Sequence, residues 1–472
     1  MKTKYIIIIL SFFSAFSCID DKSNIGLKEI STIEYVDGGL EPIYRVDKPD
    51  MLILGAPRVK QSYIEKPLQY EWQVDHKVVS TEDTLRYPCT RLTKPNELLN
   101  CRLKIYNDDG AIFQTFLLEV NANKEGIMIM SKYNGESLIS FKRTDRLELP
   151  AIRDAYKINN PTIPLGKEPG TLYYDTKHVY VTTSNPTKAV ILDIQTFNVT
   201  EILDLPAGSH ITNISGHPYF TELCMLSNGK FYNYDIQSNF PFQSTWESFP
   251  ADAKFSNKSV FLYDYTYFQM GYTLWEETKN ELWIYLQSGI TPYSLTGDKL
   301  KGKELLAIMP CYYTQNLLLA VKDNNSNISM VQYTPDKISP VYGGSPIPPL
   351  GQLIIKEIPA SSNMNENSVF LTRSAESTTY YTKGNAVYMY DYIGGNFEPK
   401  PIIKIGNNED QIVAMAFSPD ETKLFIGVNS PSGNYKGSLY CYDATTYTLL
   451  WSETGMAGEI VSMIYKGDGT IQ

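Results

Sequence analysis

The chain has 472 residues, of which 43% are hydrophobic and 20% are charged. This balance is typical of globular proteins and excludes a disordered or collagen-like chain, while the length predicts two or more domains. The formal net charge of −10 argues against a nucleic-acid partner, because phosphate backbones bind basic surfaces. Tyr occurs 35 times, Gly 30 times and Pro 27 times, which favours strands joined by turns.

The first residues have the pattern of an export signal. Lys2 and Lys4 precede an apolar run at residues 5–16 (YIIIILSFFSAF), which is the order found in a signal peptide. A membrane-spanning helix needs about 20 apolar residues, so this run is too short for a retained anchor. We therefore expect residues 1–17 to be a signal peptide.

Cys18 follows the apolar run directly. Residues 14–18 (SAFSC) resemble a relaxed lipobox, which implies that Cys18 is acylated and holds the protein on a membrane through its lipid chains alone. Asp20 and Asp21 resemble the signal that sends Bacteroidota lipoproteins to the outer face of the outer membrane. Retention in the periplasm is the alternative, because any lipoprotein tether can be acidic. Residues 18–30 form the expected tether.

Residues 31–122 have the pattern of short strands joined by frequent turns. An alternating segment at residues 70–74 (YEWQV) turns through DHK into the next strand. Residues 103–106 (LKIY) meet residues 111–120 (AIFQTFLLEV) through the turn NDDG. Several short strands with regular turn signals predict a β-sandwich.

These segments resemble the PKD-like, immunoglobulin-type family. Residues 70–87 (YEWQVDHKVVSTEDTLRY) are similar to its central hairpin, and residues 101–120 are similar to its last two strands. YEWQVDHK stands in place of the family's WDFGDG-type core, which favours the PKD-like lipoprotein variant. The resemblance implies a spacer or binding module. Cys89 and Cys101 flank one loop and are a candidate disulfide in an oxidising compartment.

Residues 123–472 contain an internal repeat. Residues 411–422 (QIVAMAFSPDET) recur as residues 459–470 (EIVSMIYKGDGT), a spacing within the roughly 40–50 residues of a propeller blade. The second copy ends after one strand, so we expect residues 126–131 and 136–142 to complete a blade shared by both ends of the domain. The predicted fold is all-β: a PKD/immunoglobulin-like sandwich, then a β-propeller of seven blades, with eight as the alternative. Two stacked β-sandwiches would make the repeat accidental.

No signature of catalysis or of cofactor binding stands out. The sequence contains no GxSxG, GxxxxGK[ST] or GxGxxG motif, and its four His have no Cys or acidic cluster around them. Residues 323–327 (DNNSN) lack the spaced carboxylates of a calcium loop and predict a hairpin turn. We expect no catalytic residue, no metal and no cofactor.

Clustered aromatic residues are the one functional indication. Exposed Tyr and Trp offer rigid apolar faces with a polar tip, which suit sugars or peptides. The alternative is that these rings pack between blades. The candidate ligand-binding residues are Tyr265, Tyr267, Tyr272, Trp275, Tyr312 and Tyr313.

The order of signal, PKD-like domain and propeller resembles the PKD-like family lipoproteins found beside Sus-type nutrient-uptake systems. That resemblance implies a surface-exposed, non-catalytic accessory on the cell outer membrane. Its implied partners are a TonB-dependent porin with its lid lipoprotein, and a glycan or peptide ligand. One alternative is a propeller hydrolase or lyase that acts on a surface polysaccharide or peptide. Another is a scaffold with only a protein interface.

The lipid anchor can be tested directly. Cys18→Ala should release or mislocalise the protein, because no other segment of the sequence is apolar enough to hold it on a membrane. Membrane fractionation measures this, and an unchanged membrane-bound fraction would overturn the lipobox interpretation. Changing Asp20 and Asp21 to Ala should reduce labelling of intact cells by a surface protease or antibody.

Overall fold

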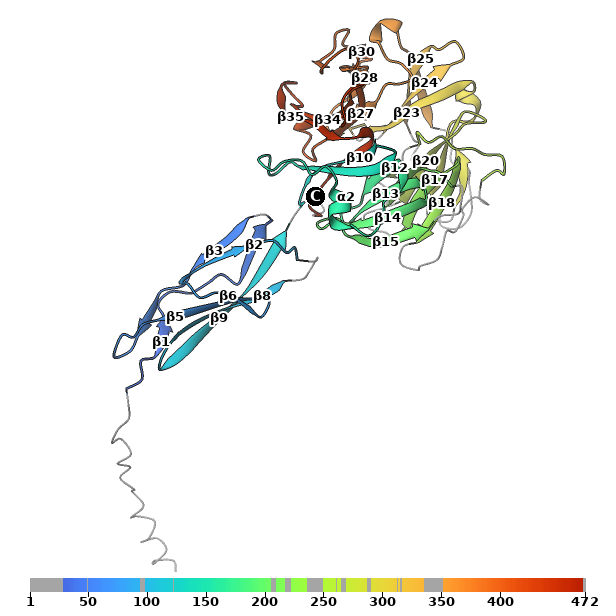
Figure 1. Cartoon of the computed structure of the whole chain (residues 1–472). Coiled ribbons are helices and arrows are strands. Elements are labelled where there is room, and N and C mark those ends of the chain that lie inside the picture. Colours follow the sequence, from blue (N-terminus) through green and yellow to red (C-terminus); the bar gives the residue numbers. More distant parts are fainter. Residues whose placement is uncertain are drawn as a thin grey trace, which may run out of the picture. The chain divides into compact units, whose positions relative to one another are not determined.

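The computed structural model forms two compact units, Met1–Ala122 and Asn123–Gln472 (Figure 1). The structure describes residues 29–48, 50–93, 98–121, 123–204, 209–216, 222–235, 249–259, 261–264, 269–286, 290–311, 313–314, 316–334 and 351–469. Within these residues, no helix has both the length and the apolar character needed to cross a membrane. Each unit is described by itself.

The first unit is built of three sheets. The largest has the order β2-β9-β8-β5-β6, and β1 pairs with β4 while β3 pairs with β7. The strands are β1 (Ile33–Tyr35), β2 (Ile43–Asp47), β3 (Met51–Gly55), β4 (Val59–Gln61), β5 (Gln69–Val74), β6 (Lys77–Ser80), β7 (Thr84–Pro88), β8 (Leu99–Asn107) and β9 (Gly110–Asn121). Both predicted hairpins are present. Asp75 and His76 form the β5–β6 turn with φ of 49° and 64°, left-handed values that suit a tight hairpin.

Trp72 lies at the centre of this unit's core. Its ring is fully buried, packs edge-to-face on Phe116 at 6.3 Å between centroids, and its Nε1 donates to the Glu82 carbonyl at 2.9 Å. The core also contains Leu52 from β3 and Leu85 from β7, so the β3–β7 ribbon covers one face of the five-stranded sheet. Two layers around one core make this unit a β-sandwich.

The disulfide predicted between Cys89 and Cys101 is absent, which corrects that expectation. Both residues are free thiols buried in the sandwich core. Each Sγ lies within hydrogen-bonding distance of a backbone carbonyl two residues earlier in the chain. Burial raises the pKa of Cys101 to about 12, so the thiolate that disulfide formation needs is scarce. The two cysteines act here as small apolar core residues.

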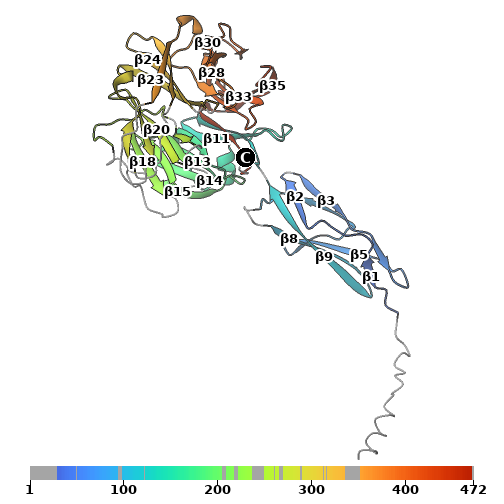
Figure 2. The same cartoon turned by 180° about the vertical axis from the view of Figure 1, so that it is seen from behind.

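The second unit consists of seven sheets among its described residues (Figures 1 and 2). Blade 1 is β12 (Lys167–Tyr174), β13 (His178–Asn185), β14 (Thr187–Asp193) and β15 (Val199–Asp204); blade 2 is β16 (Ile211–Gly216), β17 (Glu222–Ser227) and β18 (Lys230–Asp235); blade 3 is β19 (Phe261–Asp264), β20 (Gln269–Glu276), β21 (Glu281–Leu286) and β22 (Ile290–Ser294). Blade 4 is β23 (Lys303–Cys311), β24 (Asn316–Asp323), β25 (Ile328–Thr334) and β26 (Gln352–Glu357); blade 5 is β27 (Phe370–Thr372), β28 (Thr378–Lys383), β29 (Ala386–Asp391), β30 (Asn396–Phe397) and β31 (Ile403–Lys404); blade 6 is β32 (Gln411–Phe417), β33 (Lys423–Asn429), β34 (Gly437–Asp443) and β35 (Leu449–Ala457). Short helical segments are α2 (Ala155–Asn159), η3 (Gly297–Leu300) and η4 (Ala360–Ser362).

The seventh sheet joins the two ends of this unit. It has the order β11-β10-β36, with β10 (Gly126–Tyr133) and β11 (Glu136–Arg143) from the start and β36 (Glu459–Lys466) from the end. β36 pairs antiparallel with β10, as predicted from the incomplete repeat. The first strands of the blades contact one another around the ring: β36 contacts both β12 and β32, and β27 contacts both β23 and β32. This topology is a β-propeller.

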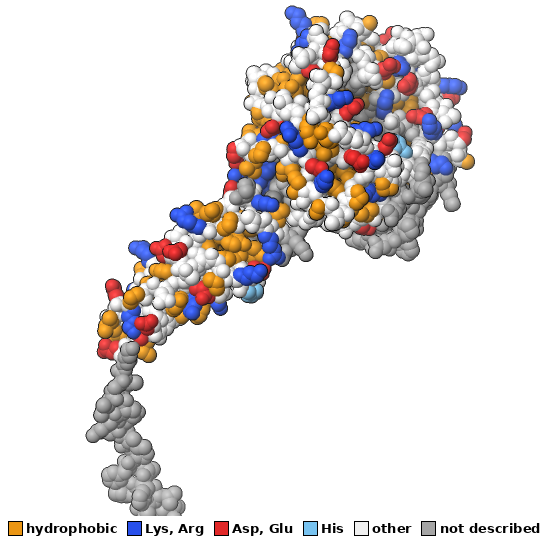
Figure 3. Space-filling view, in the orientation of Figure 1, with side chains coloured by type: hydrophobic (Ala, Val, Ile, Leu, Met, Phe, Trp, Pro, Cys, Tyr) orange, Lys and Arg blue, Asp and Glu red, His pale blue; other side chains and the backbone are white. Residues whose placement is uncertain are grey.

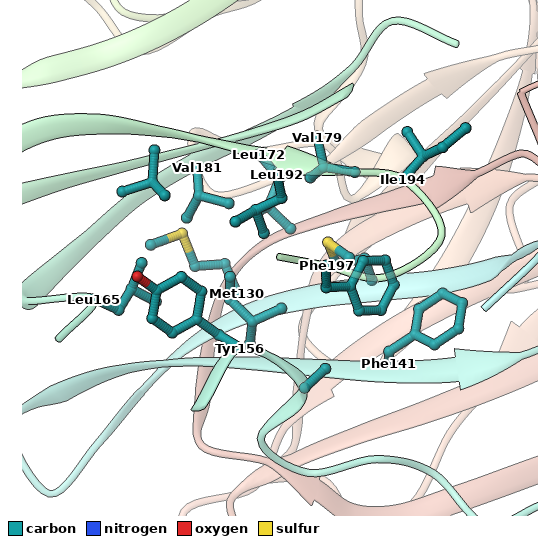
Figure 4. Packing of buried hydrophobic residues seen from close by; sticks show 14 residues of the cluster. Met130, Phe141, Tyr156, Leu165, Leu172, Val179, Val181, Leu192, Ile194 and Phe197 are labelled. Atoms are coloured by element: carbon teal, nitrogen blue, oxygen red, sulfur yellow. The ribbon is translucent and has the colours of Figure 1, made fainter. Parts of the chain in front are cut away.

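The residues shared by the two copies of the repeat pack between neighbouring blades. Ile412 and Ile460 are each 4% exposed, and Met415 and Met463 are each 9% exposed, at matching places in β32 and β36. Between blades 7 and 1, Met130 and Phe141 pack with Leu172, Val181 and other residues that Figure 4 shows. Apolar contact between neighbouring blades therefore supplies the core.

Lys466 clamps the junction where the ring closes. Its side chain is fully buried at the end of β36, and its Nζ donates to the carbonyl oxygens of Asn123 at 2.6 Å, of Lys124, and of Gly467 at 2.8 Å. The ammonium also lies over the Phe141 ring, 5.9 Å from its centroid. Three donors meet three acceptors, so one side chain ties the first residues of this unit to its last strand.

Replacing this clamp should loosen the ring. Lys466→Met keeps the length of the side chain but leaves one buried and two partly buried carbonyl oxygens without this donor. A buried group left unsatisfied costs about 1–3 kcal/mol. We expect a lower melting temperature and more aggregation from an opened sheet edge. Lys132→Met is the matched control, because Lys132 is exposed and its contact with Glu168 is 3.9 Å long. Equal melting temperatures for the two variants, measured by calorimetry, would contradict the clamp.

Candidate functional site

The two faces of the ring are defined by the order of strands in each blade. We name the strands of a blade A to D from the ring's centre outward, so blade 7 has β36 as A, β10 as B and β11 as C. Antiparallel pairing places the B–C turns and the D–A connections on one face, named the B–C face. The chain enters the propeller at Asn123 and Gly126, which lie beside Lys466 on the opposite face.

A pocket of about 390 Å³ opens on the B–C face between blades 3 and 4. Three chain segments form it: the connection before β19, the β20–β21 turn and the start of β23. The lining residues are Ser256, Asn257, Lys258, Trp275, Glu277, Asn280, Glu304 and Leu305.

A buried carboxylate shapes one wall of this pocket. Glu276 is 1% exposed, and its carboxylate accepts backbone N–H groups from Lys254 at 3.0 Å, Thr278 at 3.0 Å and Lys279 at 2.6 Å. These bonds hold the β20–β21 turn against the connection before β19. Carboxylates that accept several N–H groups form strong, charge-assisted bonds. The pocket wall is therefore fixed from behind by a residue that does not line it.

The same turn reaches across to blade 4. Asn280 has a φ of 61°, a left-handed value that Asn tolerates better than most residues. Its Oδ1 accepts the N–H of Gly302 at 3.0 Å, just before β23 begins. Lys258 adds a second link, because its Nζ donates to the Leu305 carbonyl at 3.4 Å. Blades 3 and 4 are thus held together at the rim of the pocket.

Opposite charges alternate around the rim. Glu277 pairs with Lys254 at 3.0 Å. Lys322 pairs with Glu304 at 3.2 Å and with Glu366 at 2.8 Å. The bonds to Glu366 and Glu304 raise the pKa of Lys322, and the bond from Lys322 lowers the pKa of Glu366. Figure 3 shows the same mixture of acidic and basic side chains on the visible face of the second unit.

An aromatic stack lies elsewhere on the B–C face, between blades 6 and 7. The rings of Tyr133, at the end of β10, and Tyr435, before β34, are 4.3 Å apart and 3° from parallel. The Arg153 guanidinium lies 4.8 Å from the centroid of the Tyr435 ring. Stacked rings and a cation over a ring each stabilise such a group by a modest amount. Both tyrosines are half-buried, so this group is accessible at the surface.

A Ser–His contact occupies the same face near blades 1 and 2. Ser184, at the end of β13, forms a hydrogen bond with Nδ1 of His210, which precedes β16. A His beside a hydroxyl is the start of a nucleophile–base pair. Within the described part of the chain, however, no carboxylate forms a hydrogen bond with the His210 ring. The pair therefore lacks the third group of a catalytic triad there.

The predicted aromatic residues fall into separate places. Tyr272 is 3% exposed and packs against Phe231 and Tyr285 in the core, which corrects its expected role as a ligand contact. Trp275 is 1% exposed and contributes to the pocket wall without offering an open ring face, a second correction. Tyr313 is 57% exposed after the end of β23, so it lies on the face opposite the pocket.

The physical reason for these corrections is the architecture of a blade. A B strand such as β20 has a neighbouring blade on each side, so residues 272–276 are all buried regardless of alternation. Aromatic density here indicates packing between blades. Tyr265, Tyr267 and Tyr312 lie outside the described residues, as do Cys18, Asp20 and Asp21.

The pocket residues were missed by the sequence analysis because most are ordinary polar residues of turns. One usable signal was the run of residues 276–280 (EETKN), a polar turn directly after an apolar strand. Residues 323–327 do form the predicted hairpin turn, in which Asp323 Oδ1 accepts the N–H groups of Asn325 and Asn327, each at 2.9 Å. The described residues contain no group of three His, Cys, Asp or Glu arranged to hold a metal ion.

Comparison with solved structures finds propellers at low sequence identity. A quinonprotein alcohol dehydrogenase-like protein from Bacteroides thetaiotaomicron is 14% identical, with a TM-score of 0.45, over 94% of this chain and 98% of that one. The dihydro-heme d1 dehydrogenase NirN is 10% identical, with a TM-score of 0.40, over 85% of this chain and 75% of that one. The WD40 domain of SCAP from fission yeast is 10% identical, with a TM-score of 0.36, over 58% of this chain and 62% of that one.

No protein-family model and no curated protein matches the chain. The likenesses to solved structures are too distant to assign a ligand or a reaction. The assignment of a propeller therefore rests on the sheet topology described above.

The hydrogen bonds that Glu276 accepts lead to a prediction about stability. Glu276→Ala should lower the free energy of unfolding by about 1–3 kcal/mol, because it removes the acceptor of three backbone N–H groups. Glu277→Ala, its neighbour, should cost about 1 kcal/mol or less, because its pair with Lys254 is exposed. Chemical denaturation of both variants measures the difference. If Glu277→Ala proves the more destabilising change, the role given to Glu276 is wrong.

Proposed function

We propose that this chain is a lipid-anchored protein of the outer-membrane surface that acts as a non-catalytic accessory of a TonB-dependent, Sus-type uptake system. Its role is to bind a glycan or peptide, or the transporter itself. One observation carries the proposal: the pocket and the aromatic stack share the B–C face, whereas the chain that leads back to Cys18 enters the ring on the opposite face.

The chemistry of the B–C face suits reversible binding. The pocket presents amide, ammonium and carboxylate groups beside a rigid framework, and small-ligand sites use a few such groups to orient the ligand. The Tyr133–Tyr435 stack adds an aromatic surface in which the two rings already pack against each other. Preorganised groups lose little entropy on binding.

One observation favours the alternative, a hydrolase acting on a surface polymer. The Ser184–His210 contact gives a hydroxyl a neighbouring base on the same face. In a hydrolase of this kind, the Ser184 hydroxyl would attack a carbonyl carbon while its proton moves to His210. His210 would pass that proton to the leaving amine or alcohol as its bond to the carbonyl carbon breaks, and water would then hydrolyse the acyl–serine bond. The hydrolase alternative therefore rests on the Ser184–His210 pair, which can be tested by substitution.

The test is binding and turnover in the same mixture. Soluble protein containing residues 23–472 should bind a member of a panel of oligosaccharides and peptides by calorimetry, or co-purify with a porin and its lid lipoprotein, and leave every ligand intact. Mass spectrometry of the mixtures detects cleavage. Products that disappear with Ser184→Ala would replace this proposal with the hydrolase. Cleavage products that persist in Ser184→Ala would contradict the non-catalytic role and would show that Ser184 is not the nucleophile.

A further inference from the structure

We infer that the pocket between blades 3 and 4 binds a neutral sugar unit of a glycan. This inference rests on the proposed function and names the ligand class of one site. Three properties of the pocket carry it: the polarity of the lining, the balance of charge and the size.

The lining is polar and offers no aromatic face. Trp275 and Leu305 are the two apolar residues among those that line it, and they are 1% and 3% exposed. Asn257, Glu277 and Glu304 are exposed at the rim, where they offer both donors and acceptors. An apolar peptide side chain would find little apolar surface here and would cover polar groups without pairing them. Sugar hydroxyls, each a donor and an acceptor, satisfy both kinds of group.

Both carboxylates that line the pocket are already paired, and the third charged residue, Lys258, donates to the Leu305 carbonyl at 3.4 Å. Glu277 has Lys254 at 3.0 Å, and Glu304 has Lys322 at 3.2 Å. A cationic ligand would therefore compete with Lys254 and Lys322 for these carboxylates, whereas an anionic ligand would lie beside both carboxylates and lose part of its own hydration. A neutral ligand can accept and donate hydrogen bonds at the free lone pairs and N–H groups of these ions without separating them. Bonds to charged groups are stronger than bonds between neutral groups.

The size and the framework are also suitable. A volume of about 390 Å³ lies at the lower end of the roughly 300–1,000 Å³ of small-ligand pockets. Because the rim residues are exposed, the rest of a glycan chain can continue into solvent. Bonds of Glu276 and Asn280 to the backbone hold the walls in place, so they need not form when the sugar binds.

Asn257 allows the sharpest test. Its side chain is exposed and lines the pocket, so substitutions there should leave the fold intact. Asn257→Trp should fill the mouth of the pocket, and Asn257→Ala should remove one amide. Asn408→Ala is the matched control, an exposed Asn in the connection between blades 5 and 6. Probes are neutral trisaccharides of glucose, mannose, galactose and N-acetylglucosamine, with the galacturonic acid trisaccharide as the anionic comparison.

We expect at least one neutral trisaccharide to bind more tightly than the galacturonic acid trisaccharide in calorimetry. Asn257→Ala should weaken that binding by about three- to tenfold, the loss expected for a single hydrogen bond. Asn257→Trp should weaken it by more than tenfold, and Asn408→Ala should leave it unchanged. Circular dichroism melts verify that all three variants are folded.

Failure of this inference is separable from failure of the proposed function. If a neutral sugar binds equally well to Asn257→Trp, the pocket is not the site, although binding without turnover still stands. If only galacturonate, only peptides or only a porin binds, the ligand class is wrong while the accessory role survives. Cleavage of the bound glycan would overturn the accessory role but not the location of the site.

Discussion

The pairing of β36 with β10 is the interaction on which the rest of the propeller depends. Without it, β10 would lose its partner on one side and both ends of the ring would expose open sheet edges. Lys466 reinforces this pairing from within the core, since it binds carbonyl oxygens of Asn123 and Lys124 as well as that of Gly467. These contacts join residues far apart in the sequence, so ring closure reduces the conformational entropy of the chain between them. The buried contacts at the junction offset this loss.

Closure at this place also decides what each face of the ring can do. The buried Lys466 and the incoming chain lie on the face opposite the B–C face, whereas the B–C face of the same blade carries Tyr133 in its stack with Tyr435. The pocket between blades 3 and 4 opens on that second side as well. Structural and candidate ligand-binding features are thus divided between the two faces.

Much of this architecture could be predicted from the sequence, for a clear physical reason. The residues shared by the repeats, such as Ile412 with Ile460 and Met415 with Met463, are buried between blades, so packing constrains them alike. The hairpin at Asp75 was predicted from its turn residues, and the shared blade was predicted from the incomplete repeat at the end of the chain. The pocket could not be predicted, because its residues belong to three segments whose proximity depends on how two blades meet. Burial of Tyr272 likewise depends on the neighbouring blades, which alternation within one strand does not reveal.

The way Glu276 and Glu277 divide their roles suggests how such a site can change without loss of the fold. Glu276 is buried and binds backbone N–H groups of its own turn and of the preceding connection, while Glu277 faces the pocket and an exposed lysine. A substitution at the first residue alters the framework, whereas a substitution at the second alters mainly the pocket surface. Asn280 has both roles, because it lines the pocket and also accepts the N–H of Gly302, which directly precedes the first strand of the next blade. The lining of the pocket can therefore vary at Asn257, Glu277 and Glu304, as long as Glu276 and Asn280 hold its walls in place.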